Sequence, residues 1–159
     1  MRILVISDTH GKRKGMEEIQ RREGEVDALI HLGDIEGTEA HLDAIFDCPK
    51  YLVRGNNDFF SSLPEEIEFS LGSYKVWATH GHSYHINMGP EWLIQEGKAR
   101  EADIVMFGHT HRPYLKKYAD IIALNPGSVS YPRQEGRKGS YMIMEIDSEN
   151  QLSFDQKYL

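Results

Sequence analysis

The chain has 159 residues, a formal net charge of −7 and one cysteine. This length predicts a single domain over residues 1–159, the lone cysteine excludes an intrachain disulfide framework, and the negative charge argues against a general nucleic-acid surface. The longest aliphatic run, Ile3–Ile6, is far shorter than the ~18 residues of a transmembrane helix and too short for the apolar core of a signal peptide. We therefore expect a cytoplasmic protein without a membrane partner.

Short apolar runs recur along the chain, and helical segments lie between them. Runs of this kind, rich in Val, Ile and Leu, are typical of strands that are buried on both faces. They occupy Ile3–Ile6, Ala28–Leu32, Tyr51–Val53, Val76–Ala78, Ile104–Phe107 and Ile121–Leu124.

Three helices are predicted between these strands. The first presents Met16 and Ile19 on one face and ends at Gly24. The other two are predicted from an opening residue and an apolar stripe. Thr38 is expected to cap the second helix, whose apolar stripe is Leu42, Ile45 and Phe46 and which ends at Cys48-Pro49. Pro90 is expected to open the third helix, which would bury Trp92, Leu93 and Ala99.

Two hairpins are predicted in the second half of the chain. Each is a pair of apolar or alternating segments around a short turn: Phe69–Leu71 with Tyr74–Val76 around Gly72-Ser73, and Tyr141–Asp147 with Gln151–Asp155 around Ser148-Glu149-Asn150. Helix-linked strands followed by hairpins indicate either one mixed sheet or two sheets packed together with helices outside.

A carboxylate, carboxamide or imidazole follows five of the predicted strands, mostly beside a glycine. The carboxyl ends of parallel strands share one edge of an α/β sheet, and sites are commonly built there. Each motif alone is typical of a turn, but five in succession at strand ends are poorly explained by turns. The motifs are Ser7-Asp8-Thr9-His10-Gly11, Gly33-Asp34, Arg54-Gly55-Asn56-Asn57-Asp58, Thr79-His80-Gly81-His82 and Gly108-His109-Thr110-His111.

The side chains of these motifs offer oxygen and imidazole nitrogen atoms and no thiolate. Such a set suits Mn, Fe, Zn, Ni or Co and excludes an iron–sulfur cluster. The candidates exceed the four ligands of one tetrahedral ion, but they suffice for two ions that share a carboxylate. Two ions about 3.5–4 Å apart are typical of enzymes that catalyse displacement at phosphorus.

The order Asp-x-His, Gly-Asp, Gly-Asn-x-Asp, His and Gly-His-x-His resembles that of the calcineurin-like metallophosphoesterases. The short chain, the Thr79–His82 block and Asn125-Pro126-Gly127-Ser128 resemble the small single-domain phosphodiesterase branch, and the resemblance runs from Ile3 to about Arg133. It implies an α/β fold, a four-layer α-β-β-α sandwich of two mixed β-sheets flanked by helices. It also implies a two-metal centre that hydrolyses phosphodiester bonds with a bridging hydroxide.

The resemblance implies a place for each metal ligand. One divalent ion would be held by Asp8, His10 and His111, the other by Asn56, His80 and His109, and Asp34 would bridge the two. Among the metals that suit these ligands, we expect Mn or Ni.

One departure from the family pattern concerns the leaving group. In many members a histidine that protonates the leaving group follows the Gly-Asn pair, whereas this chain has Asn57, which has no such proton to give. Asp58, which would orient that histidine, loses its partner, and its role in catalysis is open. The small branch commonly lacks this histidine, which suits phosphodiesters better than monoesters. For His82, a catalytic role facing the substrate and a purely structural role both stay open.

Arg54, Tyr131 and Arg133 are the remaining candidates for substrate contact, together with Asn57. A guanidinium binds phosphate oxygens through two parallel hydrogen bonds, although a plain surface arginine is an equal interpretation of Arg133. The run Lys12–Lys14 is better interpreted as a solvated loop.

We therefore predict a dinuclear-metal phosphodiesterase that acts on a small phosphodiester, and we leave a homo-oligomer open. One alternative is a metal-binding scaffold of the same fold, as in the small subunit of retromer. The loss of one or more metal ligands would favour a scaffold, but all seven ligand positions here carry competent residues. The other is a nuclease of the same superfamily, which the negative charge and the short loops between motifs disfavour.

Overall fold

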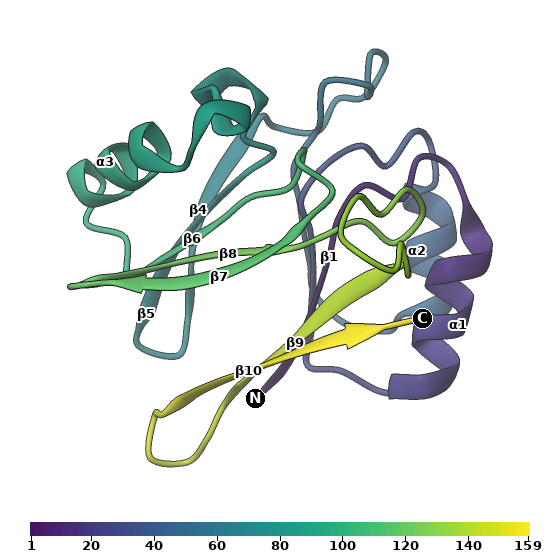
Figure 1. Ribbon diagram of the computed structural model, residues 1–159. Coiled ribbons are helices and arrows are strands. Elements are labelled where there is room, and N and C mark those ends of the chain that lie inside the picture. The colour runs from purple at the N-terminus through teal and green to yellow at the C-terminus, as the bar shows by residue number, and fades with distance from the viewer.

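The computed structural model describes residues 1–159 as two five-stranded β-sheets packed against each other, with helices on both outer faces (Figure 1). The layers follow the order α-β-β-α, because α1 and α2 cover one sheet and α3 covers the other. This architecture confirms the four-layer α/β sandwich expected from the resemblance.

The first sheet has the strand order β10-β9-β1-β2-β3. Strands β1, β2 and β3 run parallel, whereas β9 pairs antiparallel with both β1 and β10. The bounds are Arg2–Ile6 for β1, Ala28–His31 for β2, Lys50–Leu52 for β3, Ser140–Ile146 for β9 and Leu152–Tyr158 for β10.

The second sheet has the order β4-β5-β6-β8-β7. Its central strands β5, β6 and β8 are parallel, and an antiparallel edge strand lies on each side. The bounds are Glu66–Leu71 for β4, Tyr74–Thr79 for β5, Ile104–Met106 for β6, Pro113–Tyr118 for β7 and Ile121–Pro126 for β8.

Three α-helices and two short 3₁₀ helices connect the strands. None of the α-helices has the length and apolar content that a membrane crossing requires. Their bounds are Arg13–Glu23 for α1, Glu39–Ile45 for α2 and Glu91–Ala99 for α3, and the 3₁₀ helices η1 and η2 span His82–Tyr84 and Ile86–Met88.

The alternation of side chains along β1 explains why its sequence is apolar without a break. Ile3 and Val5 point into the core between the two sheets, whereas Leu4 and Ile6 point into the core beneath α1 and α2. Successive side chains of a strand point to opposite faces, so a strand with a covered face on each side needs an apolar residue at every position. The same rule places Val105 of β6 against the α3 layer.

The predicted helices and hairpins are present, with three corrections in detail. Trp92 is 64% exposed and Ala99 is exposed, because α3 packs through Leu93, Ile94 and Gly97 instead. A Cβ atom on Gly97 would overlap Val105, so this glycine lets the helix approach the sheet closely.

The two other differences concern Thr38 and β7. Thr38 does precede α2, but its hydroxyl donates to the Ile35 carbonyl and makes no capping hydrogen bond. Strand β7 was not predicted, because an exposed edge strand that contains Lys116 and Lys117 has no apolar run to reveal it.

Candidate metal centre

The five predicted motifs come from both sheets and meet where the two sheets adjoin. The segments after β1, β2 and β3 belong to the first sheet, and those after β5 and β6 belong to the second. Hydrogen bonds join the two groups: the Leu32 carbonyl accepts from His80 Nδ1 at 2.6 Å, and Asp8 Oδ2 accepts from the His109 backbone N–H at 3.2 Å. The site is therefore assembled across a sheet-to-sheet junction and not along one sheet edge.

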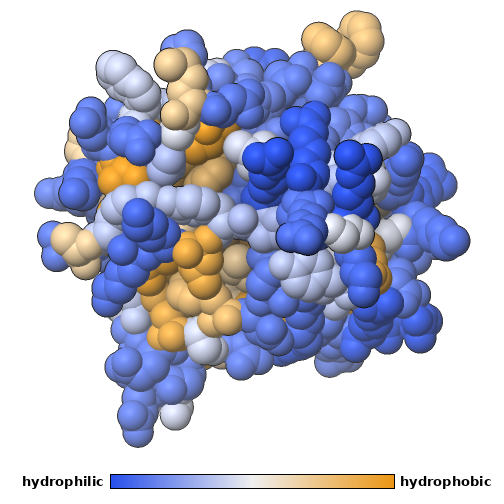
Figure 2. All heavy atoms as spheres, viewed as in Figure 1, coloured by the Kyte–Doolittle hydropathy of each residue, from blue (hydrophilic) through white to orange (hydrophobic).

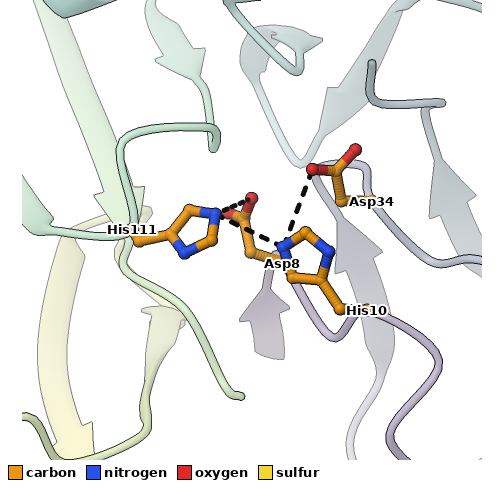
Figure 3. Close-up of side chains that lie close together, drawn as sticks. All are labelled: Asp8, His10, Asp34 and His111. Atoms are coloured by element: carbon orange, nitrogen blue, oxygen red, sulfur yellow. Dashed lines mark hydrogen bonds and ion pairs between the residues drawn. The ribbon is translucent and has the colours of Figure 1, made fainter. Parts of the chain in front are cut away.

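Four of the expected ligands form a compact cluster. Asp8, His10, Asp34 and His111 each offer a ligand atom, and these atoms all lie within 4.8 Å of one another. Figure 3 shows the four side chains pointing toward one another, with His10 Nε2 3.3 Å from His111 Nε2 and 3.7 Å from Asp34 Oδ2. Asp8 Oδ1 lies 3.1 Å from His111 Nε2. This spacing allows the four residues to bind one cation together.

The hydrogen bonds behind two of the imidazoles determine where their lone pairs point. His80 Nδ1 and His111 Nδ1 face the carbonyl oxygens of Leu32 and Tyr131, at 2.6 and 2.7 Å. A carbonyl only accepts, so Nδ1 carries the proton and the neutral ring turns an Nε2 lone pair toward the cluster. This is the tautomer that a histidine needs in order to bind a metal through Nε2.

Asp8 gives the clearest sign that the cluster suits a cation. The residue is fully buried, and its Oδ1 atom accepts no hydrogen bond even though it points at His111 Nε2. A buried carboxylate oxygen without a donor is costly, and a neutral His111 would face it with a lone pair. A divalent ion between the two atoms would satisfy both, so the residues present fit a metal.

Protons and metal ions compete for this site. Burial lowers the pKa of His80, but a hydrogen bond to Asp34 and the charges of Asp8 and Asp34 outweigh it, so the pKa lies above the usual 6.5. Burial likewise raises the pKa of Asp34, yet contacts with His80 and Asn57 hold it below its usual range. Asp34 is thus ionised at neutral pH, and a bound cation would displace a proton from His80.

Asp34 lies between the two groups of imidazoles. Its Oδ2 atom is 3.7 Å from His10 Nε2 and 3.5 Å from His80 Nε2. Asn57 holds the carboxylate in place, because its backbone N–H donates to Oδ1 at 2.9 Å and its side-chain amide donates to Oδ2 at 2.7 Å. Gly55 lies so close behind that a Cβ atom there would overlap Asp34 Oδ1.

The second expected group of ligands is less converged. Asn56 Oδ1 lies 3.2 Å from His80 Nε2, and the rings of His80 and His109 are 5.1 Å apart between centroids. His109 Nε2 accepts a hydrogen bond from the Asn87 side chain at 3.0 Å. Burial, and then the charge of His80, lower the pKa of His109 to about 4, so this ring is neutral at physiological pH.

The backbone at the ligands is unusual. Five of them have a positive φ, which non-glycine residues rarely adopt: Asp8 at 54°, His10 at 47°, Asp34 at 56°, His109 at 65° and His111 at 58°. Strain of this kind persists only where the surrounding structure imposes it, and it is concentrated at functional sites.

The remaining expected residues surround the cluster with different roles. Asp58 is buried, and its oxygens accept the backbone N–H groups of Gly55 and Glu36, both at 2.7 Å, so it positions the two loops that carry Asn56 and Asp34. Arg54 forms an ion pair with Glu65. Both side chains thus have partners within the protein in this structure.

The side chains of His82 and Arg133 lie near the cluster and have no hydrogen-bond or ion-pair partner. The His82 ring lies 5.5 Å from His80 and 6.2 Å from His109 between centroids, and its buried Nδ1 has no hydrogen-bond partner. Burial and the charge of His80 lower the pKa of His82. Arg133 is exposed at the edge of the site, and its backbone N–H donates to the His111 carbonyl at 2.9 Å.

Sequence reasoning missed two residues that touch the ligands. Glu36 Oε1 lies 2.7 Å from His10 Nδ1, and Asn87 contacts His109. The position of Glu36, two residues after Asp34, was the one available signal for it. Asn87 lies in η2, and nothing in its local sequence distinguishes it.

The chain matches the calcineurin-like phosphoesterase superfamily domain over residues 1–149. The probable metallophosphoesterase YsnB of Bacillus subtilis is 34% identical over 150 residues, which cover 94% of this chain and 86% of YsnB. The phosphodiesterase YfcE of Escherichia coli K12 is 28% identical over 171 residues, with 92% of this chain and 89% of YfcE covered.

Two further matches also span most of the chain. The vacuolar protein sorting-associated protein 29 of Schizosaccharomyces pombe is 30% identical over 136 residues, which cover 82% of this chain and 73% of that protein. The crystal structure of a predicted phosphoesterase from Streptococcus pneumoniae TIGR4 has a TM-score of 0.79 at 33% identity and covers 99% of this chain and 97% of its own. The match of the family to nearly the whole chain, together with these relatives, shows that this protein belongs to the calcineurin-like phosphoesterase superfamily.

Proposed function

We propose that the protein is a metal-dependent phosphodiesterase that hydrolyses a small phosphodiester at the junction of its two sheets. The observation that carries this proposal is the cluster in which Asp8 Oδ1 has no hydrogen-bond donor and the Nε2 atoms of His80 and His111 point inward. Membership of a phosphoesterase superfamily and the phosphodiesterase relative YfcE support the reaction class.

The ligands divide between two divalent ions, for which Mn or Ni is our first choice. Two ions bound there would supply a nucleophilic hydroxide at neutral pH and positive charge for the phosphate oxygens. We assign Asp8, His10 and His111 to one ion, Asn56, His80 and His109 to the other, and Asp34 to both. The position of Asp34 Oδ2, within 3.7 Å of His10 Nε2 and 3.5 Å of His80 Nε2, supports the shared role.

The chain's own residues bind and orient the phosphodiester. Asn56 and Arg133 are placed to hold phosphate oxygens, since a carboxamide N–H and a guanidinium both donate hydrogen bonds. His82 is the partly buried imidazole beside the second group of ligands, and we assign it to the leaving oxygen. Asn57 is already engaged by Asp34, so its effect on substrate choice acts through that carboxylate.

The test combines metal content with a comparison of substrates on one preparation. After loading with Mn or Ni, we expect two ions per chain and faster cleavage of bis(p-nitrophenyl) phosphate than of p-nitrophenyl phosphate or DNA at matched concentration. A single ion under saturating metal would contradict the two-metal assignment.

The same experiment separates the alternatives. Full metal occupancy without hydrolysis of any ester would favour a metal-binding scaffold. Faster cleavage of DNA than of the small diester would favour a nuclease. The complete set of seven ligands supports the enzyme over the scaffold.

A further inference from the structure

Three arginines beside the metal cluster have no partner in the protein. Five of the nine arginines in the chain form ion pairs with carboxylates, namely Arg2, Arg21, Arg22, Arg54 and Arg100, and Arg13 at the start of α1 forms none. The guanidinium groups of Arg112, Arg133 and Arg137 form neither an ion pair nor a hydrogen bond, yet all three line the same hollow next to His10 and His111. In a chain of net charge −7, free arginines concentrated at the site call for an explanation.

The hollow has the size and charge of an anion site. It has a volume of about 650 Å³, within the range of roughly 300–1,000 Å³ that is typical of small-molecule sites. Its one carboxylate, Glu36, is engaged by His10 Nδ1 at 2.7 Å. The Lys12 ammonium lies 3.8 Å from the ring centroid of Tyr131, which also lines the hollow, and adds further positive charge.

The backbone fixes two of the arginines relative to the metal ligands. Arg112 follows His111 directly, and the Arg133 backbone N–H donates to the His111 carbonyl at 2.9 Å. Figure 2 shows the most strongly hydrophilic side chains of this face gathered over the loop that joins β8 to β9, which contains Arg133 and Arg137. The backbones of Arg112 and Arg133 are therefore anchored beside the expected metal ligand His111.

A second hollow lies on the other side of Arg112 and Arg133. It has a volume of about 580 Å³, and these two arginines line both hollows. Its other lining is largely apolar or aromatic, with Ile86, Met88, Pro90, Phe107, Pro113 and Tyr114. The site thus offers positive charge on the side of His10 and an apolar surface on the side of Asn87 and His109.

We infer that the preferred substrate is a phosphodiester that carries a second phosphate group, which Arg112 and Arg137 bind while Arg133 and the metal ligands hold the phosphate that is cleaved. This inference rests on the proposed phosphodiesterase function and adds its substrate class. One diester phosphate fits at the metal ligands, and three unpartnered guanidinium groups exceed what that single negative charge needs. The apolar hollow receives a ring-bearing group of the same substrate, such as a nucleobase.

The test uses two diesters that differ only in the second phosphate. Thymidine 5′-(p-nitrophenyl phosphate) and its 3′-phosphate have the same reacting centre, where water adds to phosphorus and p-nitrophenolate leaves. We expect kcat/KM to be about tenfold higher for the 3′-phosphate, because hydrogen bonds to charged groups contribute at least that factor. The advantage should shrink steeply with added salt.

Arginine variants assign the effect to the hollow. Arg112→Ala and Arg137→Ala should each remove most of the advantage of the 3′-phosphate while changing the turnover of bis(p-nitrophenyl) phosphate by less than about threefold. Arg21→Ala, which removes the same charge from an exposed ion pair on α1, is the control and should preserve the advantage. Equal losses on both diesters would overturn the inference, because the arginines would then serve the reacting phosphate.

Binding without turnover keeps the inference separate from the proposed function. In EDTA, thymidine 3′,5′-bisphosphate should bind about tenfold more tightly than thymidine 5′-phosphate by calorimetry, and Arg137→Ala should abolish the difference. Hydrolysis of both diesters at equal rates with equal binding of the two nucleotides would overturn the inference alone. Tighter binding of the bisphosphate without hydrolysis of any diester would overturn the proposed function alone.

A parallel pair distinguishes the source of the second phosphate. Glycerophosphoinositol and its 4-phosphate also differ only in a second phosphate, and neither carries a nucleobase. A gain restricted to the nucleotides would support the use of the apolar hollow, whereas a gain restricted to the inositol pair would support the arginine site and overturn the assignment of that hollow.

Discussion

The two halves of the candidate metal centre differ in how closely their ligand atoms lie together. Around His10 and His111 the ligand atoms already lie within 4.8 Å of one another, together with both carboxylates. Around His109 the ligand set is more open, since His109 Nε2 is occupied by Asn87. The ligand atoms of one half are thus close together, whereas a metal ion could bind His109 Nε2 in the other half only if its hydrogen bond to Asn87 were broken.

The elements that carry each half explain the difference. Three of the four residues of the first half, Asp8, His10 and Asp34, follow β1 and β2, which pair in parallel in the first sheet. This half is also tied by buried hydrogen bonds, such as Ser128 Oγ to the Asp8 carbonyl at 2.8 Å. Asn87, which holds His109, lies on a short 3₁₀ helix in the β5–α3 connection. Preorganisation thus follows the sheet core, and loops supply the adjustable part.

The largest effect is expected from Asp34→Asn, because Asp34 is the residue that contacts both halves. A neutral amide lacks the negative charge with which a carboxylate bridges two dications, so we expect diester hydrolysis to fall by at least about a hundredfold, consistent with the several kcal/mol that metal ions contribute. Elemental analysis should show loss of one ion with the other retained. More than a tenth of wild-type activity would show that Asp34 is not shared.

Gly55→Ala tests the support of the shared carboxylate without changing any ligand. The added Cβ atom would overlap Asp34 Oδ1 and the Asp34 backbone, so we expect roughly a tenfold or greater loss of activity and a decrease of about 1–3 kcal/mol in the free energy of unfolding. Steady-state kinetics and urea unfolding measure the two effects.

Gly24→Ala is the control for the glycine substitution. It has open space around it and a φ of 65°, so it should show the strain of a positive φ, about 1 kcal/mol, with activity unchanged. Loss of activity in this variant would mean that general destabilisation, and not the overlap with Asp34, explains Gly55→Ala.

Acid should loosen the converged half through His31. This buried ring accepts the Gly33 N–H at Nδ1 and donates to Thr9 Oγ1 from Nε2, so it is held neutral. Burial lowers the pKa of His31 from 6.5 to about 4. The unfolded chain therefore binds more protons between these values, and the free energy of unfolding falls as the pH falls from 6.5 to 4, by about 3 kcal/mol.

Urea unfolding of the metal-free protein at a series of pH values measures this effect. His80 acts in the opposite direction, since its raised pKa stabilises the fold at low pH and loses that contribution as the pH rises. His31→Gln isolates the contribution of His31, because the variant lacks the titrating ring and should depend less steeply on pH between 6.5 and 4. An equal slope in both proteins would assign the acid sensitivity to other groups, His109 among them.

The smallest effect is expected from Asn57→His, which probes substrate choice beside the shared carboxylate. Asn57 has no proton for a poor leaving group, and general acid catalysis contributes about 10²–10⁴-fold in favourable geometry. We expect a modest rise of about tenfold in alkyl monoester turnover and a loss of no more than a few-fold on diesters. The rise is limited because Asp58, committed to the N–H groups of Gly55 and Glu36, is not free to orient the new ring.

The pH dependence of the two rates in this variant identifies the cause. A monoester rate that declines on the basic side with a pKa absent from the wild type would show that the introduced imidazole donates the proton. Equal changes on monoesters and diesters would remove Asn57 as the reason for diester preference and would direct attention to His82.

The sequence by itself determined most of the strands, the three α-helices and the chemistry of the ligands. Unbroken apolar runs such as Ile3–Ile6 indicate strands covered on both faces, and the residues that follow them are oxygen and nitrogen donors in an order typical of one superfamily. Local rules were enough for these features, because strand periodicity and donor type depend on neighbouring residues alone.

Only the tertiary structure decided how these residues meet. The pairing of five strand ends across two sheets, the carbonyls that set the tautomers of His80 and His111, and the commitment of Asp58 and Arg54 to other partners all depend on segments far apart in the chain. The same holds for Arg112, Arg133 and Arg137, which line one hollow without forming an ion pair. A side chain's partners are set by packing between distant elements, and local sequence carries little information about them.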